Sequence, residues 1–279
     1  MSIKNSKSLK SIGLFDSGVG GLTVLREVSC LLPNEHLVYL ADTARVPYGN
    51  RSKETIIRYT LETIPFWKEQ DIKLLILACH TASSHALTLL QEHLSIPVIG
   101  VIQGGVQKVL ETVTQGPVGI FATRSTIESE VYQTALSERL PRVKIFPVAC
   151  PLFVPLVEEG FLDHPATRSI AEHYLQFLQE NKLEAALLAC THYPLLRPVI
   201  QEVLGSDVLL IESAEPTAIQ AKNYLTENNL LNTSSPRDPE FYVTDAPEKF
   251  AKLAKHFCDS EAFSLKRMNI QEMIESGFA

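Results

Sequence analysis

Short apolar runs recur along the whole chain, and the segments between them space their apolar residues as helices do. The runs typical of strands are residues 11–15, 37–41, 73–78, 97–101, 118–122, 143–148, 185–189, 208–211 and 241–244. Residues 73–78 (KLLILA) are nearly all apolar, as expected of a strand buried on both faces of a parallel sheet. The helix candidates are residues 22–31, 52–68, 126–139, 167–181 and 249–258. This alternation predicts an α/β fold with parallel sheets.

Two of the predicted strands echo each other. Residues 74–81 read LLILACHT and residues 185–192 read AALLACTH, so each apolar run ends in Ala-Cys, followed by Thr and His and then a helix. The simplest account is two similar α/β halves, each placing one thiol, Cys79 or Cys190, at the carboxyl end of a central strand. Ligands of such sheets bind outside the carboxyl ends of the strands. We therefore expect both thiols in one cleft.

Composition and charge narrow the class of protein. The 279 residues correspond to about two domains. The net charge of −7 argues against a nucleic-acid partner, because phosphate binding needs a basic surface. No apolar run approaches the roughly 20 residues of a membrane helix and no signal peptide follows the N-terminal lysines, so we expect a cytoplasmic protein without membrane attachment. The five cysteines include no CxxC pair, which favours reduced thiols over disulfides.

The paired cysteines are the first candidates for chemistry. At the start of a helix, the helix dipole lowers the pKa of a thiol and favours the reactive thiolate, as we expect for Cys79 and Cys190. The alternative is that both are small buried hydrophobic residues. Cys30, Cys150 and Cys258 lack the paired setting and are interpreted as structural.

Several residues near the thiols offer acid–base or anion-binding groups. His192 can lower the pKa of the neighbouring thiol or relay its proton, or it can simply bond the backbone at a helix start. Asp16 opens the segment FDSGVGG and can orient a thiol or bind an ammonium group; alternatively it caps the next helix. Ser17 and the glycines after it let backbone N–H groups approach an anion. His85 is interpreted as a solvated helix position.

Two polar loops are further candidates for binding a ligand, and a zinc site is an alternative use of the Cys and His residues. Residues 42–49 (DTARVPYG) form a compact polar loop, and residues 123–126 (TRST) are suited to cap a helix or to hold a carboxylate. Cys79, His80, Cys190 and His192 offer soft ligands for zinc, but neither pair has the ligand spacing usual for zinc sites. Because no P-loop, GxGxxG or GxSxG motif is present either, we expect no metal or nucleotide site.

The motifs taken together resemble the glutamate racemases of the aspartate/glutamate racemase superfamily. The matching segments are GLFDSGVGGLTVL, YLADTARVPYG, LACHTAS, PVIGVI, ACPLFVPLVEEG, LACTHYPLL and IESAEPTA, which stand in family order between about residues 12 and 220. The resemblance implies two flavodoxin-like domains related by pseudo-two-fold symmetry, with glutamate in the cleft between them. It implies residues 1–100 plus 210–279 as the domain of Cys79 and residues 101–209 as the domain of Cys190. The sequence does not decide between a monomer and a homodimer.

The resemblance also implies a reaction and a set of site residues. The reaction is the interconversion of L- and D-glutamate by two opposed bases without pyridoxal phosphate, metal or nucleotide, which supplies D-glutamate for peptidoglycan. Cys79 and Cys190 are the implied acid–base pair, with Asp16 on the Cys79 side and His192 with Glu158 on the Cys190 side. By residue type alone, Glu158 would be a solvated helix end. The implied substrate contacts are Ser17, Pro47, Tyr48, Gly49, His80, Thr81, Thr123, Thr126 and Thr191.

One departure from the family pattern stands next to the first thiol. The family has Asn after this cysteine, and this chain has His80, which differs from an amide in shape and in titration. Residues 102–104 (IQG) replace an Ile-Glu-Pro run, and Ala122 replaces a glycine. Two alternatives follow: a racemase or isomerase acting on aspartate or another small acid, or a binding protein on this fold without efficient catalysis.

Overall fold

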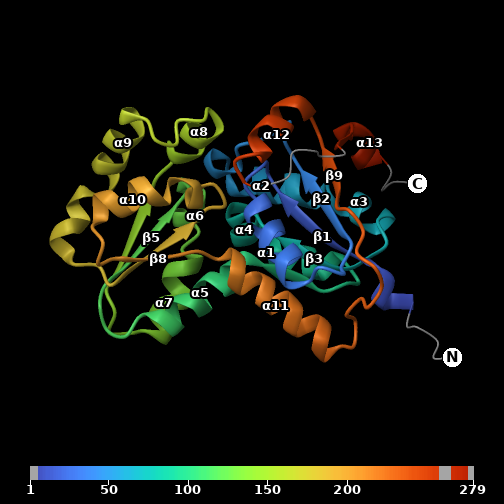
Figure 1. Cartoon of the computed structure of the whole chain (residues 1–279), viewed down its shortest axis with the longest axis horizontal. Helices are drawn as coiled ribbons and strands as arrows, with labels where there is room; N and C mark the ends of the chain where they lie inside the picture. The colour runs from blue at the N-terminus through green and yellow to red at the C-terminus, as the bar shows by residue number, and fades with distance from the viewer. Residues whose placement is uncertain (1–5, 258–264, 276–279) are drawn as a thin grey trace.

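The chain folds into two lobes, each built on a parallel sheet with helices on both faces (Figure 1). The computed structural model describes residues 6–257 and 265–275; Cys258 lies outside this part of the chain. In Figure 1 the lobe with β1, β2, β3 and β9 lies on the right, and the lobe with β5 and β8 lies on the left. The α/β class and the parallel sheets predicted from the apolar runs are confirmed.

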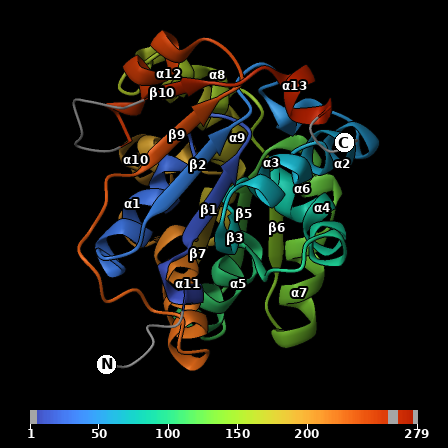
Figure 2. The ribbon, with the colours of Figure 1, turned by 90° about the vertical axis from the view of Figure 1, so that its right-hand side faces the viewer.

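The first sheet has six strands, all in parallel register with their neighbours. Its order across the sheet is β10 (Leu265–Arg267), β9 (Glu240–Val243), β2 (Leu37–Ala41), β1 (Ser11–Asp16), β3 (Ile72–Leu77) and β4 (Val98–Gly100). The C-terminal strands β9 and β10 thus return to extend the N-terminal lobe beyond β2, as Figure 2 shows. β10 was not predicted, since its exposed and charged residues give no apolar run.

The second sheet has four parallel strands. Their order is β6 (Ile145–Ala149), β5 (Val118–Ala122), β7 (Ala185–Ala189) and β8 (Leu209–Ile211). This order repeats that of β2, β1, β3 and β4: second, first, third, fourth. The repeated order corresponds to the predicted pair of similar α/β halves. The division of the chain at residues 100 and 210 stays a prediction.

The core explains why the strands read as continuous apolar runs. Successive side chains of a strand point to opposite faces, and in this fold helices cover both faces. In β3, Leu74 and Ile76 join one core cluster, whereas Leu75 and Leu77 join another on the opposite face. The first of these clusters continues into the second lobe through Phe121. One apolar cluster therefore spans both lobes, while each lobe also has a cluster of its own on the other face of its sheet.

The helices run between and after the strands. They are α1 (Leu22–Leu31), α2 (Lys53–Leu61), α3 (Ile64–Glu69), α4 (His80–His93), α5 (Val101–Thr112), α6 (Arg124–Glu128), α7 (Val131–Arg139), α8 (Phe153–Glu158), α9 (Pro165–Leu175), α10 (Arg197–Leu204), α11 (Ala214–Glu227), α12 (Pro247–Ala254) and α13 (Ile270–Glu275). α11 packs against both α1 and α5 and so connects the lobes along their base (Figure 1). No helix in the described ranges is long and apolar enough to span a membrane.

Three predicted helices are interrupted. Residues 52–68 form two helices, α2 and α3. The first helix ends at Leu61, and Pro65, which cannot continue the hydrogen-bond pattern of a helix, stands in the first turn of the second. Residues 126–139 lie in α6 and α7, which are separated at Glu130 with its positive φ of 56°. Residues 167–181 continue α9 into a 3-10 helix, Gln176–Asn181.

Candidate functional site

The candidate residues stand where strands end. Asp16 is the last residue of β1, Cys79 follows β3, and Cys190 follows β7. Thr123 follows β5 in the same way. Because the carboxyl ends of parallel strands meet at one edge of a sheet, each lobe contributes one edge to the same site.

Cys79 caps the helix α4. Its Sγ accepts a hydrogen bond from the backbone N–H of Ala82 at 3.5 Å, and its thiol donates to Ser17 Oγ at 3.6 Å. Only 6% of the residue is exposed. Burial, reinforced by the Asp16 carboxylate, raises the pKa of the Cys79 thiol to about 11, although the bonds from Ala82 and Ser17 act in the opposite direction.

Cys190 has a different local setting. It is followed by a short 3-10 helix, Tyr193–Leu196, and the backbone N–H groups of His192 and Tyr193 favour its thiolate. Burial nevertheless raises the pKa of the Cys190 thiol well above its ordinary value, and the charges of Cys79 and Asp16 add to this effect. Residues beside the two thiols meet across the lobes, since Cys79 donates to Ser17 and Asp16 accepts from Thr191.

The expected lowering of the thiol pKa values is wrong, because both pKa values are raised. The helix start is present at Cys79 and donates its N–H as predicted. Removal of the thiol from water outweighs this donor, because desolvation disfavours the charged form and a single N–H recovers only part of the loss. No local pattern of residues indicates how deeply the strand ends are buried.

Asp16, at the end of β1, contacts the residue that follows Cys190 in the other lobe. Its Oδ1 accepts a hydrogen bond from Gly18 N at 2.8 Å, and its Oδ2 accepts one from Thr191 Oγ1 of the other lobe at 3.4 Å. Burial raises the pKa of Asp16 to about 6, against the opposing charge of His192. The glycine-rich turn lies directly against the other lobe, since a Cβ on Gly20 would be 2.3 Å from Thr191 Oγ1.

His192 and Glu158 are hydrogen-bonded to each other on the Cys190 side. His192 Nε2 lies 3.3 Å from Glu158 Oε1, and the histidine is buried. Burial opposes ionisation of Glu158, but the hydrogen bond and charge of His192, together with Lys249, hold its pKa below the ordinary value. Glu158 ends α8 and is not a merely solvated helix end; the pairing provides His192 with a fixed acceptor.

Three hydroxyl groups join the lobes beside the thiols. Thr81 Oγ1 of α4 lies 2.9 Å from Thr123 Oγ1 and 3.1 Å from Thr126 Oγ1, and the last two lie 3.0 Å apart. Thr123 stands at the N-cap of α6 as expected, but its hydroxyl makes no capping bond. The cluster leaves rotatable O–H donors at the lobe interface, which suits an anionic ligand.

The loop after β2 crosses to the second lobe. Pro47 precedes the 3-10 helix Tyr48–Asn50, and a Cβ on Gly49 would lie 2.5 Å from Thr123 Cβ. Tyr48 is buried in the same core cluster as Cys79. The structure thus brings Tyr48 and Ser17 to the Cys79 side of the site and Gly49 against the threonine cluster.

His80 is bonded away from the thiol that precedes it. Its Nε2 lies 2.9 Å from Ser213 Oγ, and its ring centroid lies 6.2 Å from that of Tyr132. Burial lowers the pKa of His80 to about 3, so the imidazole is neutral. His85 is not solvated as expected: it is half-buried, with Nε2 2.9 Å from Ser125 Oγ in the second lobe.

Zinc ligands do not come together in the part of the chain that is described. No group of three or more His, Cys, Asp or Glu residues suited to a metal ion occurs there. The described cysteines, Cys30, Cys79, Cys150 and Cys190, are all free. The arrangement of thiols, carboxylates, imidazole and hydroxyls is one for moving protons.

Comparison with known proteins identifies this arrangement. The profile of the Asp/Glu/Hydantoin racemase family matches residues 20–221, and the chain belongs to this family. It is 44% identical to the glutamate racemase of Geobacter metallireducens over 263 residues, which cover 94% of this chain and 97% of that protein. It is 43% identical to the glutamate racemase of Chlorobaculum tepidum, with 90% and 93% of the two chains covered.

Solved structures agree with this assignment. The crystal structure of glutamate racemase from Francisella tularensis subsp. tularensis SCHU S4, in complex with D-glutamate, has a TM-score of 0.89 at 36% identity and covers 95% of this chain and 99% of that one. A glutamate racemase isoform from Bacillus anthracis also reaches 0.89 at 36% identity, with coverage of 93% and 97%. The family resemblance and the two-domain parallel architecture are thereby confirmed.

Proposed function

We propose that this protein interconverts L- and D-glutamate, with Cys79 and Cys190 as the two bases. The observation that carries the proposal is the placement of the two thiols: each follows the third strand of its sheet, Cys79 donates to Ser17, and Asp16 accepts from Thr191 beside Cys190. Inversion at a carbon atom needs a base on each face, and two lobes facing each other supply them. The identity to curated glutamate racemases along most of the chain supports glutamate as the substrate.

The reaction moves one proton off and one proton on. The thiolate of one cysteine takes the α-proton and becomes a thiol, the electron pair of the C–H bond spreads into the α-carboxylate, and the thiol of the other cysteine protonates the opposite face and becomes a thiolate. The threonine hydroxyls and the backbone N–H groups after Asp16 are suited to stabilise the growing charge. Single donors of this kind contribute about 3–4 kcal/mol at well-studied sites.

Formation of the first thiolate depends on the substrate. With a pKa of about 11, Cys79 is protonated at neutral pH unless a neighbouring charge favours the thiolate. An ammonium group beside it favours the thiolate, since an opposite charge lowers a thiol pKa. Asp16, ionised above a pKa of about 6, is placed to bind that ammonium or to accept the thiol proton. His192 and Glu158 have the corresponding role at Cys190.

The proposal extends to the cellular compartment, the use of the product and the two domains around the substrate. Thiols used as bases must stay reduced, which favours the cytoplasm over an oxidising compartment. The product D-glutamate is a building block of peptidoglycan, and this family role is assigned to the chain. Residues 1–100 with 210–279 and residues 101–209 are proposed as the two domains that enclose the substrate.

Incubation with L-glutamate in D₂O, without added cofactor, tests the proposal. Optical rotation and the α-proton signal in the NMR spectrum are followed together, and we expect both to disappear as racemic, deuterated glutamate forms. L-Aspartate is run in parallel. Inversion of aspartate alone would favour the aspartate alternative, and absence of both signals with either acid would favour the binding protein.

A further inference from the structure

We propose that Asp42 is a positioning residue, which with Arg45 and Thr244 fixes the loop that closes the substrate site. The inference rests on the proposed function, because the loop carries Pro47, Tyr48 and Gly49. Asp42 directly follows β2 and is fully buried. None of the hydrogen bonds found in the described ranges joins its carboxylate to either thiol, so it acts through the loop.

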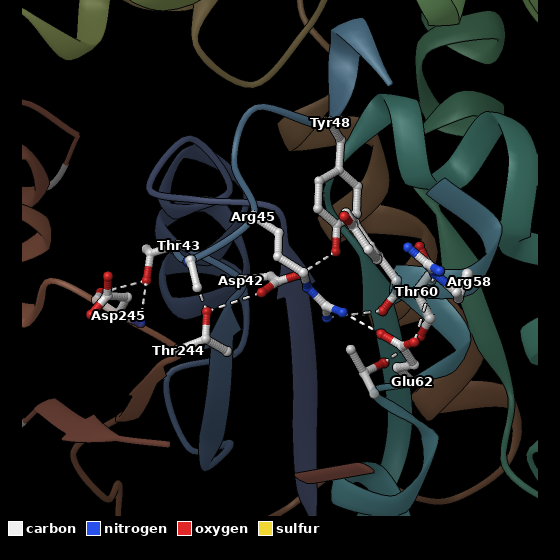
Figure 3. A network of polar contacts seen from close by, with 12 residues as sticks. Asp42, Thr43, Arg45, Tyr48, Arg58, Thr60, Glu62, Thr244 and Asp245 are labelled. Atoms are coloured by element: carbon white, nitrogen blue, oxygen red, sulfur yellow. Dashed lines mark hydrogen bonds and ion pairs between the residues drawn. The ribbon is translucent and has the colours of Figure 1, made fainter. Parts of the chain in front are cut away.

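Both oxygens of the Asp42 carboxylate are occupied (Figure 3). Oδ1 accepts a hydrogen bond from Thr244 Oγ1 at 3.0 Å. Oδ2 accepts from Arg45 Nε at 2.6 Å and from the phenol of Tyr48. A buried carboxylate is costly unless it is paired and fully bonded, and these three donors come from three points of the surrounding chain. The carboxylate thus connects the start of the loop with its tip.

Arg45 connects the loop to the neighbouring helix. Its guanidinium bonds Glu62 and donates to the carbonyl oxygen of Tyr59 at 3.3 Å. It also lies over the Tyr59 ring, 4.2 Å from the centroid. The planar fork of an arginine suits such simultaneous contacts, and a lysine cannot reproduce them. Arg45 therefore compensates the buried charge of Asp42 and holds the loop against the end of α2.

The two residues that directly follow β9 hold the first residues of the loop. Thr244 Oγ1 accepts from Ala44 N at 2.9 Å while it donates to Asp42. Asp245 N donates to Thr43 Oγ1 at 2.8 Å, and that hydroxyl donates back to the Asp245 carbonyl. Residues about two hundred positions later in the sequence thus fix the path of the loop.

The far end of the loop is packed closely against its neighbours. Gly49 lies so close to Thr123 that a side chain there would collide with it. Tyr48 packs between Phe15 and Tyr59, with ring centroids 6.4 Å and 5.7 Å away. Displacement of the loop would therefore change both the position of Tyr48 near Cys79 and the contact of Gly49 with the threonine cluster.

Two variants test the inference from opposite ends of the network. Asp42→Asn removes the charge that pairs with Arg45 and replaces one of the two acceptor oxygens with an NH2 donor, so the three donors can no longer all be accepted. Thr244→Val removes a donor to Asp42 and the acceptor for Ala44. In each we expect the KM for glutamate to rise about tenfold, the equivalent of 1.4 kcal/mol, with kcat changed less than about threefold. Arg58→Ala is the matched control, since Arg58 lies beside Glu62 and Tyr59 but does not contact Asp42.

Hydrogen exchange gives a readout that does not depend on activity. Amides of residues 43–50 should exchange faster in both variants than in the wild type or in the Arg58→Ala control, while the amides of β1 and β3 keep their protection. Unchanged KM in active variants, or unchanged loop exchange, would overturn the inference. A uniform loss of stability with wild-type KM would do the same, because it would reduce Asp42 to a structural role. An inactive wild type would instead count against the proposed function, and the exchange measurement would still decide the role of Asp42.

Discussion

The two sheets place different residues at corresponding strand ends, and only the third position matches. After the third strand stand Cys79 and Cys190, but at the end of the first strand Asp16 corresponds to Ala122. After the second strand, the charged Asp42 corresponds to Cys150, a thiol whose pKa burial raises strongly.

The difference teaches that the backbone arrangement is repeated while the side-chain chemistry is not. In the second lobe the phenol of Tyr193 bonds the backbone carbonyl of Cys150 at 2.8 Å, where Tyr48 bonds the side chain of Asp42 in the first. The carboxylate that acts on both thiols, Asp16, comes from the first lobe alone. The imidazole beside the thiols comes from the second. The two thiols proposed as bases therefore have unequal neighbours.

Removal of either thiol is the strongest way to break this pairing. Cys79→Ser and Cys190→Ser should each lower the rate of glutamate inversion by about 10²–10⁴-fold, as expected for a lost acid–base group. Because the remaining thiol serves one face only, each variant should retain slow α-deuterium exchange of one enantiomer, and the two variants should differ in which one. Polarimetry and NMR in D₂O measure both effects.

The exposed Cys30→Ser is the control for this pair and should behave as the wild type. Substantial inversion in either single-thiol variant would contradict the two-base mechanism. Exchange of the same enantiomer by both variants would contradict the assignment of one thiol to each face.

Asp16→Asn tests the shared carboxylate. We expect glutamate racemisation to fall about 10²-fold. Since the folded-state pKa of about 6 exceeds the reference of 3.8, the stability gained by protonation is present below pH 3.8 and lost as the pH rises through 6. The amide cannot ionise, so the stability of the variant relative to wild type should increase over this window, by up to about 3 kcal/mol.

Urea unfolding of both proteins at several pH values between 4 and 7.5 measures this relative stability. A difference that does not vary with pH would mean that the carboxyl does not titrate in this range. A relative stability that falls with rising pH would mean that its pKa is lowered rather than raised.

The smallest expected effect concerns His80. His80→Asn restores the family residue, but the shorter side chain loses the bond to Ser213 and leaves space beside Tyr132. We expect a free energy of unfolding lower by about 1–2 kcal/mol and a lower kcat/KM for glutamate. Ser213→Ala, which breaks the same bond but keeps the ring, should lose less. Thermal unfolding and steady-state kinetics measure the two quantities; a higher kcat/KM in His80→Asn would identify His80 as a defect in the site.

The sequence predicts what depends on local pattern and misses what depends on distant packing. Residues 118–122 and 185–189 were predicted to the residue, because a strand buried on both faces is apolar throughout. The repeated Ala-Cys ending placed both thiols correctly at strand ends. The link from Asp42 to Thr244 has no local signal, since the two residues meet only when β9 joins β2. The raised thiol pKa values were missed for the same reason: burial is a property of the assembled lobes.

The contact at Gly20 fixes the distance between the two lobes beside the site. This residue of the first lobe rests on Thr191 and His192 of the second with no room for one more carbon atom. The spacing between the lobes at this point is therefore the thickness of a bare peptide backbone. A methyl group there would act as a wedge, leaving both cysteines intact but moving them apart, and proton transfer tolerates little added distance. The absence of a side chain at Gly20 thus keeps the two thiols proposed as bases at a fixed separation.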